Sequence, residues 1–421
     1  MLKRTLAILS LLTPAAFAGT HVSIDHDANL VLDGQKTFVI SVAVLPPPDG
    51  KTPSGKSAWQ EFSDGGVNFA RIIPGQGGEI EGWTDKGFQI ANAYMDGLAS
   101  AHMYAWLWLG EDIAHFTAKE TDKAEKLKKV IETYKDHPAL GCWKGEDEPL
   151  WGEMNSKEPG TKSPDKLALP YKMIHEMDPN HPVVLIQAPR GTVKELAAYQ
   201  PVLDITGMDV FAISYPMGLH VPAWPNKDIS VVGDWTKMIV QAAGGKPVWM
   251  TLQVSWSGVT NKARTLRFPT FEQERFMTYE AIIDGARGLN YFGGANLTTL
   301  NERDRKLGYN WTFWDRILKP LLAEINEKSP LHEALVAANS KLPVKSDAKD
   351  VEFTVREVGD EIYILACKRE GDTAKVTFSG LPASVSGGDV LYEEPRTVQA
   401  KNGSFTDWFG PEEVHVYRLK K

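Results

Sequence analysis

The feature that most constrains the fold of this chain is a regular alternation of apolar runs with helix-like segments. Eight apolar runs occur in order, and each precedes a segment with helical periodicity or a helix-start signal. The runs read FVISVAVLP, NFARIIP, HMYAWLWLG, ALGCWKGEDEP, PVVLIQAP, DITGMDVFAISYP, KPVWMTLQVSW and RGLNYFGG. Continuous apolar runs are typical of strands that are buried on both faces of a parallel sheet. Eight strand–helix units predict a (β/α)8 TIM barrel, an α/β fold, from about Phe38 to about Ala338.

The alternative interpretation of this alternation is a doubly wound open sheet. A dinucleotide-binding sheet of that kind needs a glycine-rich phosphate turn after its first strand, and no such turn follows FVISVAVLP. The closed barrel is therefore the prediction. Ahead of it, HVSIDHDANLVLDGQKT has the pattern of an N-terminal β-hairpin with its turn at Asp33-Gly34.

The last part of the sequence has a different pattern. Short alternating strands such as VEFTVREV, EIYILACK, AKVTFSG and EVHVYRL are separated by Gly, Pro and Asp turns. This pattern is typical of an antiparallel β-sandwich. The predicted domains are a signal peptide at 1–18, the barrel with its hairpin at 19–341, and a C-terminal β-sandwich accessory domain at 342–421.

The first residues have the features of a secretory signal. Lys3 and Arg4 precede an apolar stretch that is too short to span a bilayer, and AFA at 16–18 has the small-x-small pattern of a cleavage site. No cysteine follows that site and no later segment is long and apolar enough for a membrane helix, so we expect no membrane anchor. The mature chain is expected to begin at Gly19 and to be secreted or periplasmic.

Composition narrows the range of partners. The chain of 421 residues is 43% hydrophobic and 24% charged, which provides ample apolar content for a large core. Its formal net charge is −8 and no basic stripe alternates with aromatic residues, so a nucleic-acid partner is not expected. Cys142 and Cys367 lie in apolar runs of different predicted domains. They are expected to be buried free thiols, with a disulfide as the alternative.

Three consecutive acids end the fourth apolar run, in the stretch GCWKGEDEPLWG. Active sites of TIM barrels lie at the C-terminal ends of the strands, where Glu146, Asp147 and Glu148 are expected. Pro149 is expected to end the strand and to hold Glu148 in an extended conformation. Crowded carboxyl groups in such a place either serve acid–base catalysis, because burial and neighbouring charge raise the pKa of one of them, or bind a hard cation. The structural alternative is an acidic loop that forms ion pairs, for example with Lys144.

The ends of the other predicted strands carry side chains that suit a sugar. Aromatic faces can stack on sugar C–H surfaces, while carboxylates and amides bind hydroxyl groups. The candidate substrate-binding residues are Arg71, Trp108, Glu111, Glu146, Tyr215, Gln253, Trp256 and Tyr291. No histidine joins the acids at a metal-ligand spacing, so neither a metal nor another cofactor is predicted. A carbohydrate is the expected partner.

The order of these motifs resembles that of secreted bacterial glycoside hydrolases of clan A, which combine a barrel with further domains. That clan has Asn-Glu-Pro at the end of strand four, and this chain has Asp147-Glu148-Pro149 there. The chain is more closely similar to a set of bacterial glycosidases whose motifs read here DEP, DVFAISYP, KPVWMTLQ, PTFEQER and GARGLNYF. The resemblance implies a glycosidase barrel with a C-terminal sandwich, in which Glu148 is the general acid.

The sequence departs from this family at one important position. Clan A enzymes have a nucleophilic glutamate at the end of strand seven, where this chain has Gln253. An amide can neither attack a sugar carbon nor act as a general base. Asp209 or Asp147 is therefore expected to serve as nucleophile or base, with Glu146 and Glu111 as further candidates.

Two functions from different classes follow from these observations. The first is a glycoside hydrolase that cleaves an oligosaccharide, polysaccharide or glycoconjugate, with Glu148, Asp209 and Asp147 as candidate catalytic residues. The second is a non-catalytic carbohydrate-binding protein on a degenerate glycosidase barrel, which Gln253 makes credible.

Overall fold

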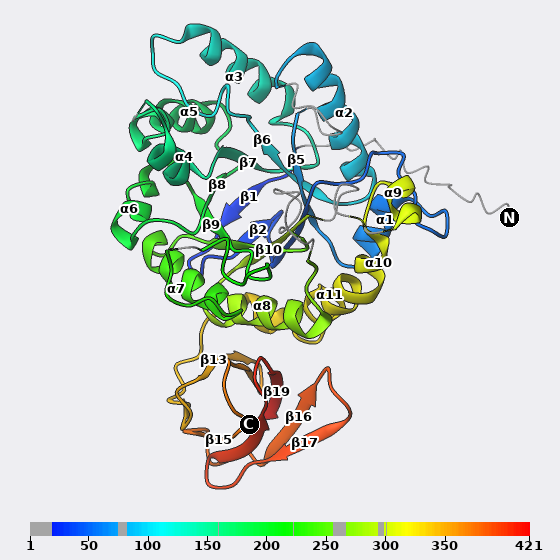
Figure 1. Cartoon of the computed structure of the whole chain (residues 1–421), viewed down its shortest axis with the longest axis vertical. Coiled ribbons are helices and arrows are strands. Elements are labelled where there is room, and N and C mark those ends of the chain that lie inside the picture. Colours follow the sequence, from blue (N-terminus) through cyan, green and yellow to red (C-terminus); the bar gives the residue numbers. More distant parts are fainter. Residues whose placement is uncertain are drawn as a thin grey trace, which may run out of the picture.

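The computed structural model describes residues 19–74, 82–158, 160–221, 223–255, 267–293, 299 and 301–421. The predicted signal peptide at 1–18 and the candidate Trp256 lie outside the described residues. The described chain forms a closed barrel, a small N-terminal sheet and a C-terminal pair of antiparallel sheets (Figure 1).

Eight parallel strands close the barrel, and each of the eight apolar runs supplies one strand. Successive strands are neighbours, and the last pairs with the first to complete the ring. The strands are β4 (Val39–Ala43), β5 (Phe69–Ile72), β6 (Tyr104–Trp108), β7 (Leu140–Asp147), β8 (Val183–Gln187), β9 (Ile205–Asp209), β10 (Val248–Gln253) and β11 (Gly288–Phe292). The TIM-barrel prediction is confirmed, and the open-sheet alternative is wrong.

Helices between the strands cover the outside of the barrel (Figure 1). The longer ones are α2 (Asp85–Ser100), α3 (Thr121–Tyr134), α5 (Pro164–Met177), α7 (Val231–Ala243) and α8 (Phe271–Ile283). The shorter ones are α1 (Ala58–Asp64), α4 (Pro149–Asn155), α6 (Val193–Ala197), η1 (Gln200–Val202), α9 (Glu302–Leu307), α10 (Trp311–Phe313), η3 (Trp314–Leu318), α11 (Lys319–Ile325) and α12 (His332–Val336). Sequence signals fix several helix starts, as in α8, where Thr270 and Gln273 form a capping box.

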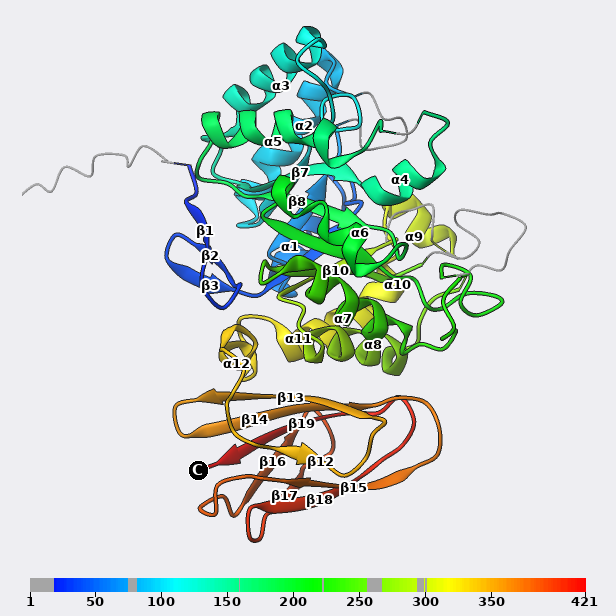
Figure 2. The ribbon, with the colours of Figure 1, turned by 90° about the vertical axis from the view of Figure 1, so that its left-hand side faces the viewer.

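The N-terminal sheet closes one end of the barrel. Its strands are β1 (Val22–Ile24), β2 (Leu30–Leu32) and β3 (Gln35–Thr37), and the predicted turn at Asp33-Gly34 has positive φ at both residues. Apolar side chains of β1 and β2 share a buried cluster with Phe69, Trp106 and Trp249 of the barrel interior. The hairpin lies at the end opposite to α4 and α6 (Figure 2). The barrel interior is therefore covered at this end, and the other end, where the C-termini of the strands lie, is the one to search for a site.

The C-terminal domain is an antiparallel β-sandwich, as predicted (Figure 2). One sheet contains β13 (Val351–Val358), β14 (Glu361–Lys368), β19 (Val414–Lys420), β16 (Gly387–Leu391) and β17 (Arg396–Gln399), in this order. The other contains β12 (Lys345–Ser346), β15 (Ala374–Ser379) and β18 (Ser404–Phe409). Phe378 lies at the centre of the core between the sheets, with its ring against Phe353, Phe405 and Tyr417.

The barrel and the sandwich are joined by both apolar and ionic contacts. Helix α8 packs on β13 and β14, and Leu365 and Cys367 of β14 belong to the same buried cluster as the barrel core (Figure 2). Arg275 of α8 donates a hydrogen bond of 2.8 Å to the carbonyl oxygen of Val414. Arg369, which follows β14, forms an ion pair of 2.9 Å with Asp234 of α7.

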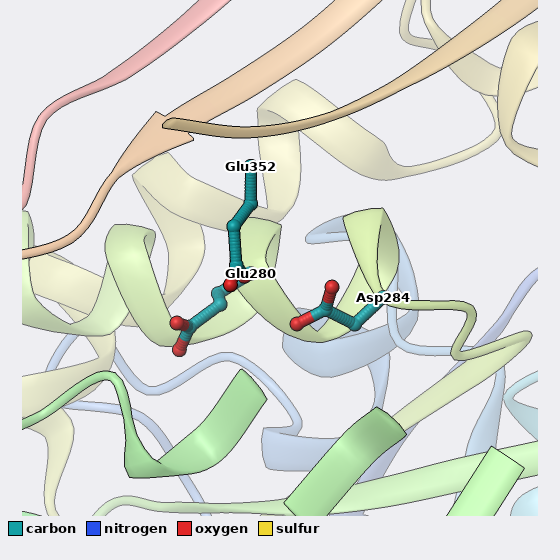
Figure 3. A group of neighbouring side chains, drawn as sticks. All are labelled: Glu280, Asp284 and Glu352. Carbon is teal, nitrogen blue, oxygen red and sulfur yellow. The ribbon is translucent and has the colours of Figure 1, made fainter. Parts of the chain in front are cut away.

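Three carboxyl groups meet at this interface. Glu280 of α8, Asp284 at its end and Glu352 of β13 have oxygen atoms within 4.8 Å of one another (Figure 3). Lys237 forms an ion pair with Glu352, and its Nζ lies 3.5 Å from Oδ2 of Asp284. The Gly233 N–H donates a 3.0 Å hydrogen bond to Glu280. Burial and the neighbouring negative charge of Glu352 raise the pKa of Asp284 to about 8. Protons therefore reduce the repulsion in this cluster at neutral pH.

Cys142 of β7 and Cys367 of β14 are buried free thiols, as predicted. Burial raises the pKa of each thiol well above its usual range, so both stay protonated and act as small core residues. Across the described ranges, no helix is long and apolar enough to cross a membrane.

Candidate active site

A pocket of about 390 Å³ opens at the C-terminal ends of the barrel strands. Its position matches that of the active sites of TIM barrels. The lining residues are Arg71, Asp147, Glu148, Trp151, Ile186, Ala188, Arg190, Asp209, Phe211, His220, Thr251 and Phe292. The three predicted catalytic acids, Glu148, Asp209 and Asp147, thus come together in one pocket, and so does the predicted binding residue Arg71.

Glu148 is held at the junction between β7 and α4. Its N–H donates a 2.8 Å hydrogen bond to the carbonyl oxygen of Ile186, and its own carbonyl oxygen accepts one from Gly152. Its backbone is left-handed, with φ 45° and ψ 48°. The expectation of an extended Glu148 was wrong. Pro149 occupies the first turn of a helix, and the chain must reverse direction at Glu148 to enter it. Left-handed backbone is costly for a residue with a Cβ, and such strain often occurs at active sites.

Asp209, at the end of β9, interacts with Glu148 across the pocket. Its carboxyl group lies within hydrogen-bonding reach of Glu148, and its Oδ1 is buried without a partner among the described residues. Burial, followed by the charge of Glu148, raises the pKa of Asp209 well above its usual range. Two carboxyl groups this close cannot both ionise readily, so the pair holds a proton at neutral pH.

Asp147 has a different environment, although it adjoins Glu148. Its carboxylate forms ion pairs of 2.9 Å with Arg71 and 2.8 Å with Lys144, whose side chain is fully buried. Burial disfavours its charge, but the two cations outweigh burial and hold the pKa of Asp147 well below its usual range. The pairing of β7 with β8 is irregular between Lys144 and Asp147. This irregularity brings both side chains to one face, where strict alternation would separate them. For Asp147, the alternative that the acids form ion pairs, for example with Lys144, is therefore the correct one.

Glu146 and Glu111 do not line the pocket. Glu146 is completely buried and binds His115 at 2.5 Å and Lys162 at 3.0 Å. Burial opposes ionisation of Glu146, but the hydrogen bond from His115 and the charge of Lys162 lower its pKa. Glu111 is exposed and lies 3.6 Å from Lys162. Both acids serve to tie together the segments that follow β6 and β7.

Trp108 is buried and supports Arg71. The Arg71 guanidinium lies 5.2 Å from the centre of the Trp108 ring, in a cation–π contact. Trp108 itself is not among the pocket-lining residues. It acts on the pocket through Arg71, which it holds against Asp147.

Gln253 and Tyr291 are buried away from the pocket. Gln253 binds the backbone of Ile213 through both ends of its amide, accepting from the N–H at 2.8 Å and donating to the oxygen at 2.6 Å. Tyr291 shares a 2.9 Å hydrogen bond with Thr278 of α8. Strand β10 instead contributes Thr251 to the pocket. Gln253 therefore fixes the segment after β9, and among the described residues no acid from the end of β10 lines the pocket.

Tyr215 is exposed on the segment after β9. Its ring stacks against the guanidinium of Arg267, and its hydroxyl accepts a 2.9 Å hydrogen bond from that side chain. It does not line the pocket in the described structure.

The pocket also contains residues that the sequence analysis did not single out as site candidates. Trp151 of α4 and Arg190, which follows β8, form one wall, with the guanidinium 4.8 Å from the ring centre. Burial lowers the pKa of His220 to about 3, so its ring is neutral. Arg190 could have been found by its position, because PVVLIQAPR puts it immediately after the fifth apolar run. His220 has no comparable signal, since it lies in a long loop.

No protein-family model matches the sequence. No curated protein matches it. Among solved structures, one described as a glycoside hydrolase has a TM-score of 0.62 at 12% identity, with 95% of this chain and 97% of that chain covered. A glycoside hydrolase family 5 protein from Bacteroides vulgatus has a TM-score of 0.61 at 12% identity, with coverage of 95% and 94%. An alpha-amylase from Geobacillus thermoleovorans has a TM-score of 0.54 at 12% identity, with coverage of 92% and 100%. At such identities the likeness shows the fold, and the fold of this chain is one that glycoside hydrolases share.

Proposed function

We propose that this chain is a glycoside hydrolase and that Glu148 and Asp209 are its two catalytic carboxyl groups. The observation that carries the proposal is the placement of these groups within hydrogen-bonding reach of each other in the pocket at the C-terminal end of the barrel. The fold shared with solved glycoside hydrolases supports it.

The paired carboxyl groups have the protonation that glycoside cleavage requires. One group must donate a proton to the leaving oxygen, while the other, ionised, attacks the anomeric carbon or activates water. The raised pKa of Asp209 keeps one proton on the pair. We assign the donor role to Glu148, because it occupies the strand-four position of the acid in the family that the sequence resembles. Asp209 then acts as nucleophile or base, and the proton passes between the two groups.

A bound sugar has to separate the two groups. Carboxyl groups are about 5–5.5 Å apart in retaining glycosidases and about 6.5–9.5 Å apart in inverting ones. We propose that the interaction between Glu148 and Asp209 belongs to the sugar-free pocket. Insertion of the glycosidic oxygen and the anomeric carbon between them would replace that contact.

Asp147 is a poor candidate for the second catalytic group. Two cations already bind its carboxylate, and their attraction makes it a weak nucleophile and a weak base. We propose that it positions Arg71 instead. This leaves Asp209 as the partner of Glu148.

The test is a screen of oligosaccharides and aryl glycosides with the wild type and the Glu148→Gln and Asp209→Asn variants. We expect the wild type to cleave at least one substrate. Glu148→Gln should lose about 10²- to 10⁴-fold in rate on an unactivated glycoside and much less on an aryl glycoside, whose leaving group needs no proton. Asp209→Asn should lower the rate strongly on both kinds of substrate. If instead Asp209→Asn is the variant whose loss depends on the leaving group, Asp209 is the general acid.

The second candidate function is carbohydrate binding without catalysis. The observation in its favour is that Gln253 replaces the strand-seven acid and is fully occupied by the backbone of Ile213. A wild-type protein that binds a glycan in the pocket but cleaves no glycoside would support this function and contradict hydrolysis.

We also propose that the protein acts outside the cytoplasm, on the strength of the secretory pattern at 1–18. N-terminal sequencing of exported protein should then begin at Gly19. A cytoplasmic protein that retains Met1 would contradict this.

A further inference from the structure

Arg190 is a cation in the pocket wall that forms no ion pair with a described carboxylate. Its Nη1 donates 2.7 Å hydrogen bonds to the carbonyl oxygens of Pro189 and His220. Its guanidinium also lies over the ring of Trp151. Among the described residues, no acid lies within ion-pair distance of Arg190, and its Nε and Nη2 have no hydrogen-bond partner.

The ring and the two carbonyl groups hold Arg190 in a fixed position. A guanidinium is planar and offers its donors as a fork, so fixing one edge also fixes the direction of the others. Since Arg190 is half-buried and lines the pocket, its remaining donors are available only to pocket contents or solvent. Fixed donors with no partner are the arrangement that binds an anion with little loss of entropy.

The charged side chains that line the pocket are two arginines, Asp147 and the Glu148–Asp209 pair. Arg71 is already ion-paired with Asp147. The Glu148–Asp209 pair shares a proton and so carries about one negative charge, which Arg190 faces. His220 is neutral. A neutral sugar offers the free edge of Arg190 only neutral acceptors, whereas an anionic group offers it charged ones, which form the stronger hydrogen bonds.

We propose that the pocket binds a sugar residue that carries an anionic group, a carboxylate or a sulfate ester, and that Arg190 is the residue that recognises this group. The proposal rests on the proposed function only in taking the ligand to be a carbohydrate. It names the substrate class of the same site and does not depend on cleavage.

Binding of free monosaccharides tests this directly, because they contain no glycosidic bond and the wild type can be used. Calorimetric titrations would compare glucuronate and galacturonate with glucose and galactose, and would include glucose 6-sulfate. We expect at least one anionic sugar to bind tenfold or more tightly than its neutral counterpart, since hydrogen bonds to charged groups are the stronger ones. The preference should decrease as salt is added. Preference for the uronate or for the sulfate identifies the anionic group.

Arg190→Gln should abolish this preference while leaving the affinity for neutral sugars within about twofold. Arg190→Lys, which keeps the charge but loses the fork, should retain part of it. Arg305→Gln, at an exposed arginine of α9, is the matched control and should behave as the wild type.

Three results would overturn the proposal: equal or tighter binding of the neutral sugar, an undiminished preference in Arg190→Gln, and no binding of any anionic sugar. Failure of the proposed function is distinguishable from these results. Selective binding of an anionic sugar without cleavage of any glycoside would contradict hydrolysis and support the assignment of Arg190. Cleavage of neutral glycosides without an Arg190-dependent preference would support hydrolysis and contradict the assignment of Arg190.

Discussion

Glu148 combines a proposed catalytic role with a backbone conformation that disfavours its side chain. Its φ of 45° lies in the left-handed region, which costs a residue with a Cβ about 1–2 kcal/mol and costs glycine little. We predict that Glu148→Gly is more stable than Glu148→Ala by about 1 kcal/mol, although both lack the carboxyl group. Urea unfolding of the two variants measures this difference. An alanine variant as stable as the glycine variant would show that the backbone is unstrained.

Asp147 supports the pocket through its charge. Removing one member of a buried ion pair leaves the other without compensation, which typically costs about 3–5 kcal/mol. Asp147→Asn is therefore predicted to lose about that much free energy of unfolding, because Lys144 is fully buried beneath it. The double variant Asp147→Asn with Lys144→Met, which also removes the buried cation, should recover most of the loss. Unchanged urea midpoints in the single variant would contradict this role.

The carboxyl cluster between α8 and β13 makes the barrel–sandwich contact sensitive to pH. The pKa of Asp284 is about 8 in the folded chain, compared with 3.8 for the ordinary group. Between about pH 4 and pH 8, the folded state therefore keeps a proton on Asp284 that the unfolded state has released. Stability from this group is complete below about pH 4 and is lost as the pH rises to about 8, by at most about 1.4 kcal/mol per pH unit.

Asp284→Asn should flatten this decrease. The asparagine cannot ionise, so the variant should gain stability relative to the wild type as the pH is raised from 5 to 8. Denaturant unfolding at several pH values provides the measurement. A difference between the two proteins that is constant with pH would contradict a buried, protonated Asp284.

The elements themselves were predictable, because each depends on a local pattern. Continuous apolar runs indicated the eight strands, and alternation with turn residues indicated the sandwich.

The details of the site depend on tertiary structure. The irregularity of β7 that turns Lys144 towards Asp147 comes from its pairing with β8, and the left-handed backbone at Glu148 comes from the reversal of the chain into α4. Gln253 and Tyr291 occupy predicted strand ends, but their hydrogen bonds to Ile213 and Thr278 direct them away from the pocket. The position of a residue along its strand predicts at which end of the barrel it lies. Packing decides whether its side chain reaches the cavity there.

The barrel and the sandwich behave as one structural unit in the whole molecule. Side chains of β14 are part of the barrel's buried cluster, and ion pairs such as Arg369–Asp234 cross the interface. We therefore predict a single cooperative thermal transition. Calorimetry should give equal calorimetric and van't Hoff enthalpies. Two separated transitions would show that the interface contributes little to either domain.

The central claim is that Glu148 and Asp209 act together as one catalytic pair. The most direct test is to measure kcat/KM for the wild type, Glu148→Gln, Asp209→Asn and the double variant on one unactivated glycoside. Groups that act as a unit are strongly non-additive, because losing either one disables the other. We predict that each single variant loses about 10²- to 10⁴-fold and that the double variant is within about tenfold of the more damaged single variant. A double variant whose loss equals the product of the two single losses, or a single variant with wild-type kcat/KM, would contradict the account.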